Sequence, residues 1–305
     1  MDDAAVSDAD AVMTDGLAER GALLGLCYRM LGSLTDAEDA VQETYARWLR
    51  LSDVERGGIR HPKSWLMKAA SRVCLDMLGS ARARREQYWG EWLPEPVPNG
   101  GLWTSQSDDG RGDDPSDRVS LDESVSMAVL VVLESMTPSE RVAFVLHDVF
   151  QYSFAEVGEI VGRSAEATRQ LASTARRRIR DERRSPVDAA AHAAVVRSFK
   201  HAWQTGDVEA LVGLLDPNAV AIGDGGGIVT ATKRPLVGRD WIVKGFTQLG
   251  KDQPVFEIEE TLVNGQLGLK VMSGDELLAV VSVAVADGRI QRIWAMRNPE
   301  KLTAW

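Results

Sequence analysis

The sequence contains one segment in which basic and amide side chains recur at the spacing of a DNA-reading helix. It is FAEVGEIVGRSAEATRQLASTARRRIR, residues 154–180. Gly158 allows two helices to cross closely, Gly162 supplies a turn four residues later, and Ser164 is able to cap the second helix. This pattern predicts a helix-turn-helix, whose arginine and glutamine side chains donate hydrogen bonds to guanine and adenine in the major groove. The alternative is a helical hairpin that ends in a solvated basic tail.

The two predicted helices have an inner stripe of apolar residues and an exposed polar side. The stripe consists of Val157, Ile160, Val161, Ala167 and Leu171. On the exposed side, the first turns of the second helix are expected to face base edges, and the arginines from Arg176 onward are expected to contact phosphates. The candidate DNA contacts are Arg163, Ser164, Glu166, Arg169, Gln170, Ser173, Arg176 and Arg177.

A second basic segment, HPKSWLMKAASRVCLDML followed by an arginine-rich stretch, begins at His61. Pro62 suits the first position of a helix, and Trp65 is expected in the core rather than as a platform on which bases stack. Binding of single-stranded DNA requires cations along the sugar-phosphate backbone. This segment supplies Lys63, Lys68, Arg72, Arg82, Arg84 and Arg85.

An acidic amphipathic helix is predicted before this segment. Thr35 and Glu38 have the spacing of a capping box, which predicts that the helix begins here. Its apolar stripe is Ala37, Ala40, Val41, Thr44, Tyr45, Trp48 and Leu49. The other side carries acids and amides, which indicate either a solvated face or a docking surface for a protein partner.

Composition excludes several classes of protein. The chain has 305 residues and a net charge of −10, yet arginines concentrate near residues 82–85 and 163–184, so two basic patches remain in an acidic protein. No apolar run is long enough to cross a bilayer, and the acidic N-terminus lacks the features of a secretory signal, so a cytoplasmic location is expected. Cys27 and Cys74 lie in apolar helical patterns and are expected in the core. Neither a metal nor a cofactor is expected.

The periodicity predicts three folded domains and a linker. Residues 15–88 and 125–185 are predicted to be helical, with Thr137, Pro138 and Glu140 capping a helix in the second segment. Residues 89–124 have the composition of a linker. Residues 188–305 begin with two helices and continue with alternating segments that predict a curved antiparallel sheet, and hence an α+β domain. The predicted strands are Val255–Val263, Leu267–Met272, Leu277–Val285 and Ile290–Met296, with a hairpin turn at Asp287 and Gly288. Trp203, Trp241 and Trp294 are expected in the core of this domain.

The order of these parts resembles the extracytoplasmic-function (ECF) sigma factors over residues 16–184. The resemblance implies that the acidic helix docks on the clamp helices of the largest subunit of RNA polymerase, and that the flap of the second subunit is a further partner. It implies polymerase contacts from Asp36, Glu38, Asp39, Gln42 and Glu43. It also implies that Lys63, Lys68, Arg72, Asp76, Arg82, Arg84 and Arg85 bind the minus-ten promoter element, and that the helix-turn-helix binds the minus-thirty-five element. The family often has asparagine before the apolar residues that precede the aspartate, whereas this chain has Arg72, Val73 and Cys74 ahead of Asp76, so the base preference of the family is not carried over to this chain.

The linker admits two interpretations. Its acids, Glu91, Glu95, Asp108, Asp109, Asp113, Asp114 and Asp117, outnumber Arg111 and Arg118. In the family, the corresponding linker follows a positively charged path toward the polymerase active site, so the acids are able to mimic nucleic acid. A disordered tether is the alternative.

Three further motifs resemble the subgroup of these sigma factors that carries a SnoaL-like extension, a cone similar to nuclear-transport-factor (NTF2)-like proteins. They are WLPEP at residues 92–96, DGGG at 224–227 and NPEKL at 298–302. Ile228 and Glu300 replace the usual lysine and aspartate of the subgroup. The resemblance implies a module that regulates in cis by contacting the sigma domains, through Asp224, Gly225, Gly226, Gly227, Asn298, Pro299, Glu300, Lys301 and Leu302. An enzyme would need an acid or base in the cone, and Asp224 is the single candidate, without a partner.

We therefore expect two all-α sigma domains followed by an α+β cone, and a non-enzymatic protein that directs core RNA polymerase to promoter DNA. The rival hypothesis is a freestanding helix-turn-helix regulator with a ligand-sensing domain. The acidic helix argues against that rival, because a freestanding regulator needs no polymerase-docking surface.

Overall fold

The computed structural model describes residues 19–86, 88–98, 125–182, 187–252 and 256–305. These residues form two compact units. The first, called here the helical unit, takes its described residues from Met1–Ala83 and Ser135–Arg177. The second, called the mixed unit, takes them from Arg84–Gly100, Val125–Glu134 and Arg178–Trp305. Among the described residues, no helix is both long enough and apolar enough to span a bilayer.

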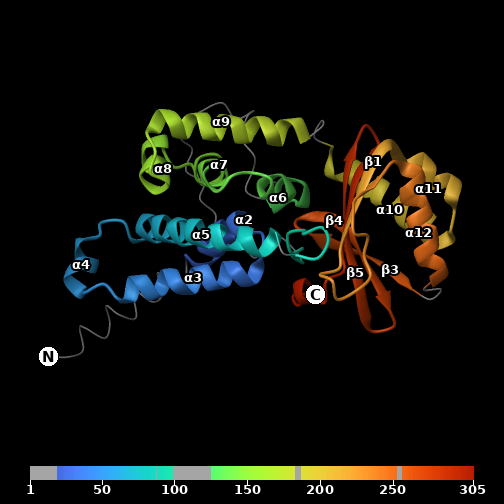
Figure 1. Cartoon of the computed structure of the whole chain (residues 1–305), viewed down its shortest axis with the longest axis horizontal. Helices are drawn as coiled ribbons and strands as arrows, with labels where there is room; N and C mark the ends of the chain where they lie inside the picture. Colours follow the sequence, from blue (N-terminus) through green and yellow to red (C-terminus); the bar gives the residue numbers. More distant parts are fainter. Residues whose placement is uncertain (1–18, 87, 99–124, 183–186, 253–255) are drawn as a thin grey trace. The chain divides into compact units, whose positions relative to one another are not determined.

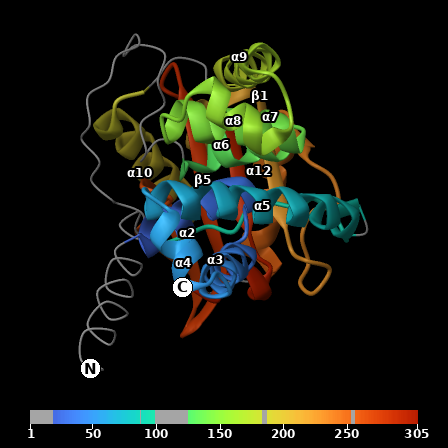
Figure 2. The same cartoon turned by 90° about the vertical axis from the view of Figure 1, so that its left-hand side faces the viewer.

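The helical unit is built from short amphipathic helices around an apolar core. In two views α3 and α5 lie alongside each other (Figures 1 and 2), and Trp48 and Trp65 meet edge to face between them, with ring centroids 5.2 Å apart. Trp65 therefore packs against a second ring, but it is half-buried rather than a fully buried core residue. The helices are α2 (Arg20–Leu31), α3 (Leu34–Leu49), α4 (Asp53–Gly58), α5 (Pro62–Glu86), α7 (Pro138–Phe144), the π-helix η4 (Val145–Val149), α8 (Phe154–Val161) and α9 (Ala165–Glu182).

Two details of α3 differ from the prediction. The helix is capped by Ser33, whose hydroxyl accepts a hydrogen bond from the Asp36 N–H, so the proposed capping box at Thr35 is wrong. Ser33 has an extended backbone, as a cap requires, whereas Thr35 already lies within the first turn. At the other end, Leu49 is 65% exposed and does not extend the buried stripe. The predicted capping box of Thr137 and Glu140 is confirmed.

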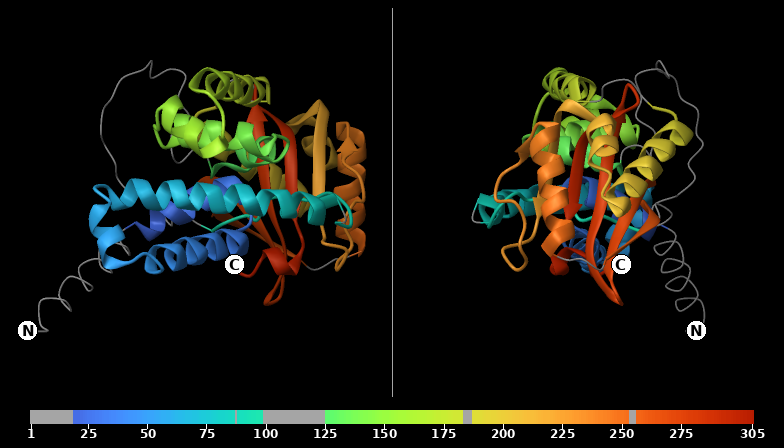
Figure 3. Two further views of the ribbon diagram at one scale, coloured as in Figure 1. Left: turned by 60° about the vertical axis from the view of Figure 1, so that its left-hand side comes forward. Right: turned by 90° about the vertical axis from the view of Figure 1, so that its right-hand side faces the viewer.

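The mixed unit contains a six-stranded sheet in the order β2-β1-β6-β5-β4-β3, with α10, α11 and α12 packed on one face (Figure 3). Its elements are α6 (Met127–Glu134), α10 (Ala189–Thr205), α11 (Val208–Leu214), β1 (Leu215–Asp224), β2 (Leu236–Val237), α12 (Arg239–Asp252), β3 (Glu257–Val263), β4 (Gln266–Ser273), β5 (Glu276–Ala286), β6 (Arg289–Met296) and the 3-10 turn η5 (Pro299–Lys301). The four predicted strands and the Asp287-Gly288 turn, in which both residues have positive φ, are confirmed.

The sheet is mixed rather than antiparallel, which corrects the prediction. β1 pairs in parallel with β6, and the register places Asp224 opposite Met296. The other pairings are antiparallel. Because parallel neighbours end at the same edge of a sheet, the DGGG motif that follows β1 and the NPEKL motif that follows β6 are brought together.

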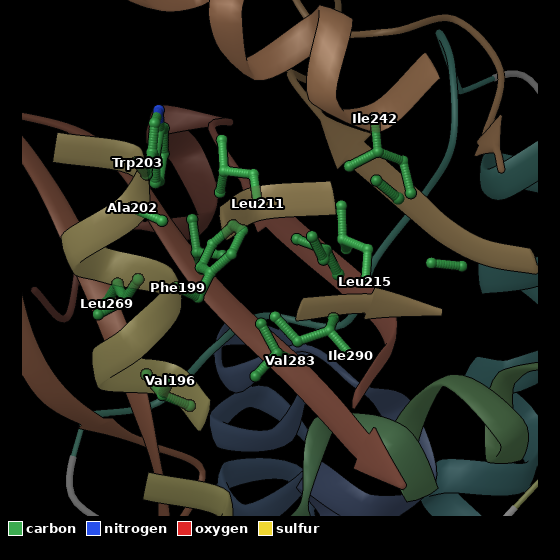
Figure 4. Packing of buried hydrophobic residues seen from close by; sticks show 14 of the residues in the cluster. Val196, Phe199, Ala202, Trp203, Leu211, Leu215, Ile242, Leu269, Val283 and Ile290 are labelled. Carbon is green, nitrogen blue, oxygen red and sulfur yellow. The ribbon is translucent and has the colours of Figure 1, made fainter. Parts of the chain in front are cut away.

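The sheet buries both of its faces. Side chains that alternate along β5 divide between two clusters, with Val281 and Val283 under the helices and Val280 on the opposite face. Figure 4 shows the first cluster, in which Phe199 and Trp203 of α10 face the sheet. The opposite face is covered by side chains from α6, from the segment 88–98 and from the C-terminus, namely Met127, Leu93 and Leu302.

The tryptophans of the mixed unit correct one further expectation. Trp203 and Trp294 are core residues, as predicted, with 6% and 3% exposure. Trp241 is 61% exposed and lies under the Lys244 ammonium, 5.3 Å from its ring centroid, so its assignment to the core is wrong. It stands near the start of α12, a helix that the sequence pattern did not predict.

Candidate nucleic-acid interface

The helix-turn-helix has the predicted local geometry. A Cβ on Gly158 would lie 2.6 Å from the carbonyl oxygen of Arg163, so the close crossing of α8 and α9 requires glycine. Gly162 has φ of 67° and ends α8 by donating to the Gly158 carbonyl. The Ser164 hydroxyl accepts a hydrogen bond from the Ala167 N–H at 3.2 Å, which caps α9. The turn and both caps therefore follow from three small residues.

The recognition helix α9 turns one side inward and leaves most of the predicted contacts exposed. Its buried positions are Thr168, Ala172, Ala175 and Ile179. The predicted inner residues Ala167 and Leu171 are only partly buried. The exposed residues are Arg163, Ser164, Glu166, Arg169, Gln170, Ser173 and Arg177.

Arg176 differs from the other candidate contacts. Its guanidinium is 2.6 Å from a carboxylate oxygen of Asp148, which lies on η4, and the two side chains are 29% and 5% exposed. A buried carboxylate needs such a partner, because an uncompensated charge in the interior is costly. Arg176 thus joins α9 to the π-helix that precedes the helix-turn-helix, and its charge is already used within the protein.

The predicted minus-ten segment lies on α5, and its cations differ in their surroundings. Arg72 and Asp76 are exposed. Lys63 forms an ion pair with Glu19 at 3.0 Å, and Lys68 forms one with Glu159 at 3.5 Å. The side chains of Arg82, Arg84 and Arg85 lie outside the described residues.

The acidic face of α3 is exposed at its centre. Asp39 and Gln42 are exposed, while Asp36, Glu38 and Glu43 are half-buried. Glu43 accepts a hydrogen bond from Arg47 at 2.9 Å, and this bond together with the nearby Arg50 lowers the pKa of the Glu43 carboxyl. The charge of Glu43 is thus partnered within the helix and its C-cap, whereas Asp39 and Gln42 remain exposed at the centre of the face.

The mixed unit contains a polar centre that the sequence analysis did not assemble. The Asp224 carboxylate is fully buried and accepts hydrogen bonds from four donors. They are the Tyr88 hydroxyl at 2.6 Å, the Leu93 N–H at 2.9 Å, the Gly226 N–H at 3.0 Å and the Lys301 ammonium at 2.8 Å. Burial, together with the hydrogen bond to Asp224, raises the pKa of the Tyr88 phenol. We call this arrangement the Asp224 clamp.

Lys301 closes the clamp on the segment 88–98. Its ammonium also donates to the Leu93 carbonyl at 2.7 Å, and it lies 4.0 Å from the Trp92 ring centroid and 4.7 Å from that of Tyr88. An ammonium held by a carboxylate, a carbonyl and two aromatic faces is well satisfied although its side chain is only 8% exposed. The WLPEP and NPEKL motifs thus meet through one lysine.

Further contacts extend the clamp along the chain. The Asn298 amide donates to the Tyr88 hydroxyl at 2.9 Å, and a Cβ on Gly226 would lie 2.4 Å from the same amide. The Trp305 indole donates to the Pro96 carbonyl at 2.9 Å. Asn264 exchanges two hydrogen bonds with Val97. Sequence analysis named the three motifs but missed Tyr88, Asn264 and Trp305, of which only Asn264 carried a signal, as part of an Asn-Gly turn.

The remaining candidate residues of the clamp are more peripheral. Gly227 has a positive φ, and its α-carbon faces the Trp89 ring, which the Lys233 ammonium covers at 4.7 Å. Ile228, in place of the lysine of the subgroup, is 54% exposed. Glu300 donates its N–H to the Asn298 side chain at 3.0 Å, and Pro299 begins η5. Within the described ranges, no group of histidine, cysteine and acidic residues has the arrangement of a metal site.

Two family models match the chain: Sigma-70 region 2 over residues 17–84, and Sigma-70, region 4 over residues 126–179. The chain therefore has both DNA-binding modules of a sigma-70-type initiation factor. It is 38% identical to the ECF RNA polymerase sigma factor SigJ of Mycobacterium tuberculosis over 94% of this chain and 91% of that protein. It is 32% identical to the probable ECF sigma factor SigI of the same species, over 97% of both.

The crystal structure of M. tuberculosis SigJ superposes with a TM-score of 0.71, at 32% identity, over 96% of this chain and 98% of that one. The chain belongs to the ECF sigma factors, as the resemblance implied. It is an alternative sigma factor that acts in transcription initiation, and its fold is that of two helical sigma domains followed by a SnoaL-like, NTF2-like domain.

Proposed function

We propose that α9 binds the minus-thirty-five element, α5 the minus-ten element and the acidic face of α3 the clamp helices of the largest polymerase subunit. The observation that carries the first assignment is the row of exposed residues from Arg163 to Arg177, in the turn and on α9, next to a turn that is capped as predicted. Arginine at such positions pairs with guanine in the major groove. The exposed Asp39 and Gln42 support the docking role of α3. The flap of the second polymerase subunit is a further partner of the protein. The protein acts in the cytoplasm.

Run-off transcription with purified core polymerase tests these roles. The template is a promoter selected from a randomised library with the wild-type holoenzyme. We expect Asp39→Arg to abolish transcription because binding to core polymerase is lost. We expect Arg169→Ala to lower transcription, because one contact with the minus-thirty-five element is lost. Asp275→Arg and Arg289→Ala change equally exposed residues of the mixed unit and should retain activity. Binding to DNA without any polymerase-dependent initiation would instead support a freestanding regulator.

We infer that the mixed unit regulates the sigma modules in cis through the Asp224 clamp. The clamp fixes residues 88–98, which directly follow α5, to the sheet of the C-terminal domain. Deletion of Asn298–Trp305 removes Lys301 and Trp305, and we expect the promoter output of the folded variant to change. Unchanged output from a variant with native circular dichroism would refute this role.

Catalysis is not part of this function. Asp224 was the single acid considered for catalysis, and its carboxylate is fully buried and accepts hydrogen bonds from four protein donors. A general acid or base must instead reach a substrate. The geometry favours a structural role for Asp224, which supports a non-enzymatic regulatory domain.

The two interpretations of the linker, a nucleic-acid mimic and a tether, now concern only residues 99–124. Residues 92–98 are held on the mixed unit, whereas Asp108, Asp109, Asp113, Asp114, Asp117, Arg111 and Arg118 lie outside the described residues. A nucleic-acid mimic and a tether both remain proposals for this stretch. Replacing Asp108, Asp109, Asp113, Asp114 and Asp117 together with asparagine should lower holoenzyme activity only if these acids mimic nucleic acid.

A further inference from the structure

The side chain of Arg169 is held by a stack of rings that the sigma-factor assignment does not explain. Its guanidinium carbon lies 5.3 Å from the centroid of Phe154, the first residue of α8. Phe154 in turn stacks on His147 of η4, with ring centroids 3.7 Å apart and an angle of 27° between the planes. His147 is fixed by a 2.7 Å contact between its Nδ1 and the Tyr152 carbonyl. Three elements of the helical unit therefore set the position of one exposed arginine.

Arg169 lies where a recognition helix approaches base edges, so the stack holds a side chain that is placed to read DNA. Arg169 is the fifth residue of α9, counted from Ala165, and is exposed. The N-terminal turns of a recognition helix are those that approach base edges. A free arginine side chain samples many rotamers, and this freedom is lost when it pairs with a base. An arginine that already rests on an aromatic face loses less of it, and its planar guanidinium keeps its donors at the edge available.

We propose that Phe154 is a positioning residue for promoter recognition, which presents Arg169 to a base of the minus-thirty-five element. This inference rests on the proposed role of α9. It also separates the roles of Arg169 and Arg176, because Arg169 is held by a ring that leaves its hydrogen-bond donors free, whereas Arg176 is held by the Asp148 carboxylate. Arg169 therefore contributes base selectivity, and Arg176 fixes the helix.

A substitution at Phe154 must leave the N-terminal cap of α8 intact. The backbone of α8 is capped by Ser153 and Glu156, whose reciprocal hydrogen bonds do not involve the Phe154 ring. Leucine at position 154 keeps an apolar side chain but removes the π face. Tryptophan keeps a π face and should therefore restore the effect.

The experiment measures selectivity rather than activity alone. Holoenzymes with wild-type, Phe154→Leu, Phe154→Trp, Arg169→Ala and Phe154→Leu/Arg169→Ala sigma factors transcribe the selected promoter and a set with each minus-thirty-five base replaced. We expect Phe154→Leu to lower discrimination at one base position by about two- to fivefold, the size of an exposed cation–π interaction. Phe154→Trp should keep discrimination, and Phe154→Leu should have no further effect in the Arg169→Ala background.

A control separates positioning from folding. Phe144→Leu replaces a core phenylalanine of α7 that is 1% exposed, so it should lower the melting temperature and leave base preference intact. The proposal is overturned if Phe154→Leu keeps wild-type discrimination, or if it lowers discrimination equally with and without Arg169. If no replacement in the minus-thirty-five element lowers transcription by the wild-type holoenzyme, the proposed role of α9 fails first, and that outcome is distinct from failure of the stack.

Discussion

Replacing Lys301 with methionine should strongly weaken the Asp224 clamp. Methionine keeps most of the volume but leaves the fully buried Asp224 carboxylate without its cation. Breaking a buried ion pair from one side costs about 3–5 kcal/mol. Three donors to Asp224 remain, from Tyr88, Leu93 and Gly226, so we expect the lower end, about 3 kcal/mol.

Hydrogen exchange measured by mass spectrometry is the appropriate assay, because it reports each segment of a multi-unit chain separately. A loss of about 3 kcal/mol corresponds to roughly a 100-fold fall in the protection of the amides around Leu93 and Asn298. Asp224→Asn/Lys301→Met removes both charges and should recover part of the protection. Lys270→Met breaks an exposed ion pair with Glu259 and should change protection by less than about threefold.

The result that would refute this reasoning is specific. If Lys301→Met and Lys270→Met change protection equally, the buried ion pair does not hold residues 88–98. If Asp224→Asn/Lys301→Met loses as much amide protection as Lys301→Met alone, the loss of stability arises from lost packing rather than from an uncompensated carboxylate.

Three further predictions concern single residues. Gly158→Ala should lower the free energy of unfolding of the helical unit by about 1–3 kcal/mol, since the added Cβ would meet the Arg163 carbonyl. Gly213→Ala, at a position with open space around it, should not destabilise the protein, and thermal melts compare the two variants. Arg176→Ala should destabilise the helical unit by about 1.5–3 kcal/mol, because it removes a charge-assisted contact to the buried Asp148. Arg177→Ala should change stability by under about 0.5 kcal/mol in the same urea titrations. The folded state raises the pKa of the Tyr88 phenol above its ordinary value of 10, so the stabilisation from Tyr88 is complete below pH 10 and is lost as the pH rises above that value. Tyr88→Phe should therefore flatten the fall in the free energy of unfolding at alkaline pH. An unaltered pH profile would contradict the role of Tyr88 in the clamp.

Much of the fold could be predicted because its signals are local. The strands β3 to β6 alternate with period two and end at Gly-containing turns, and Gly158, Gly162 and Ser164 define the helix-turn-helix through their immediate neighbours. β1 was missed because Pro217 interrupts its alternation and because its partner β6 lies far away in sequence. The start of α3 was misplaced because two residues, Ser33 and Thr35, both suit a cap.

The candidate site was predictable as a set of motifs and not as a geometry. The resemblance named DGGG and NPEKL, yet their convergence on Asp224 depends on the parallel pairing of β1 with β6, which no local pattern encodes. The ion pairs of Lys63, Lys68 and Arg176 were equally hidden, because each joins residues far apart in the chain or on separate elements.

The clamp also makes the mixed unit discontinuous in sequence. Its described residues lie on both sides of positions 99–124, with Val97 on one side and Met127 on the other. The Lys301 ammonium donates to the Leu93 carbonyl across 208 positions of the chain. Because the entropy of closing a loop must be lost before such distant contacts form, we expect the clamp to form late in folding, after the sheet that carries Asp224.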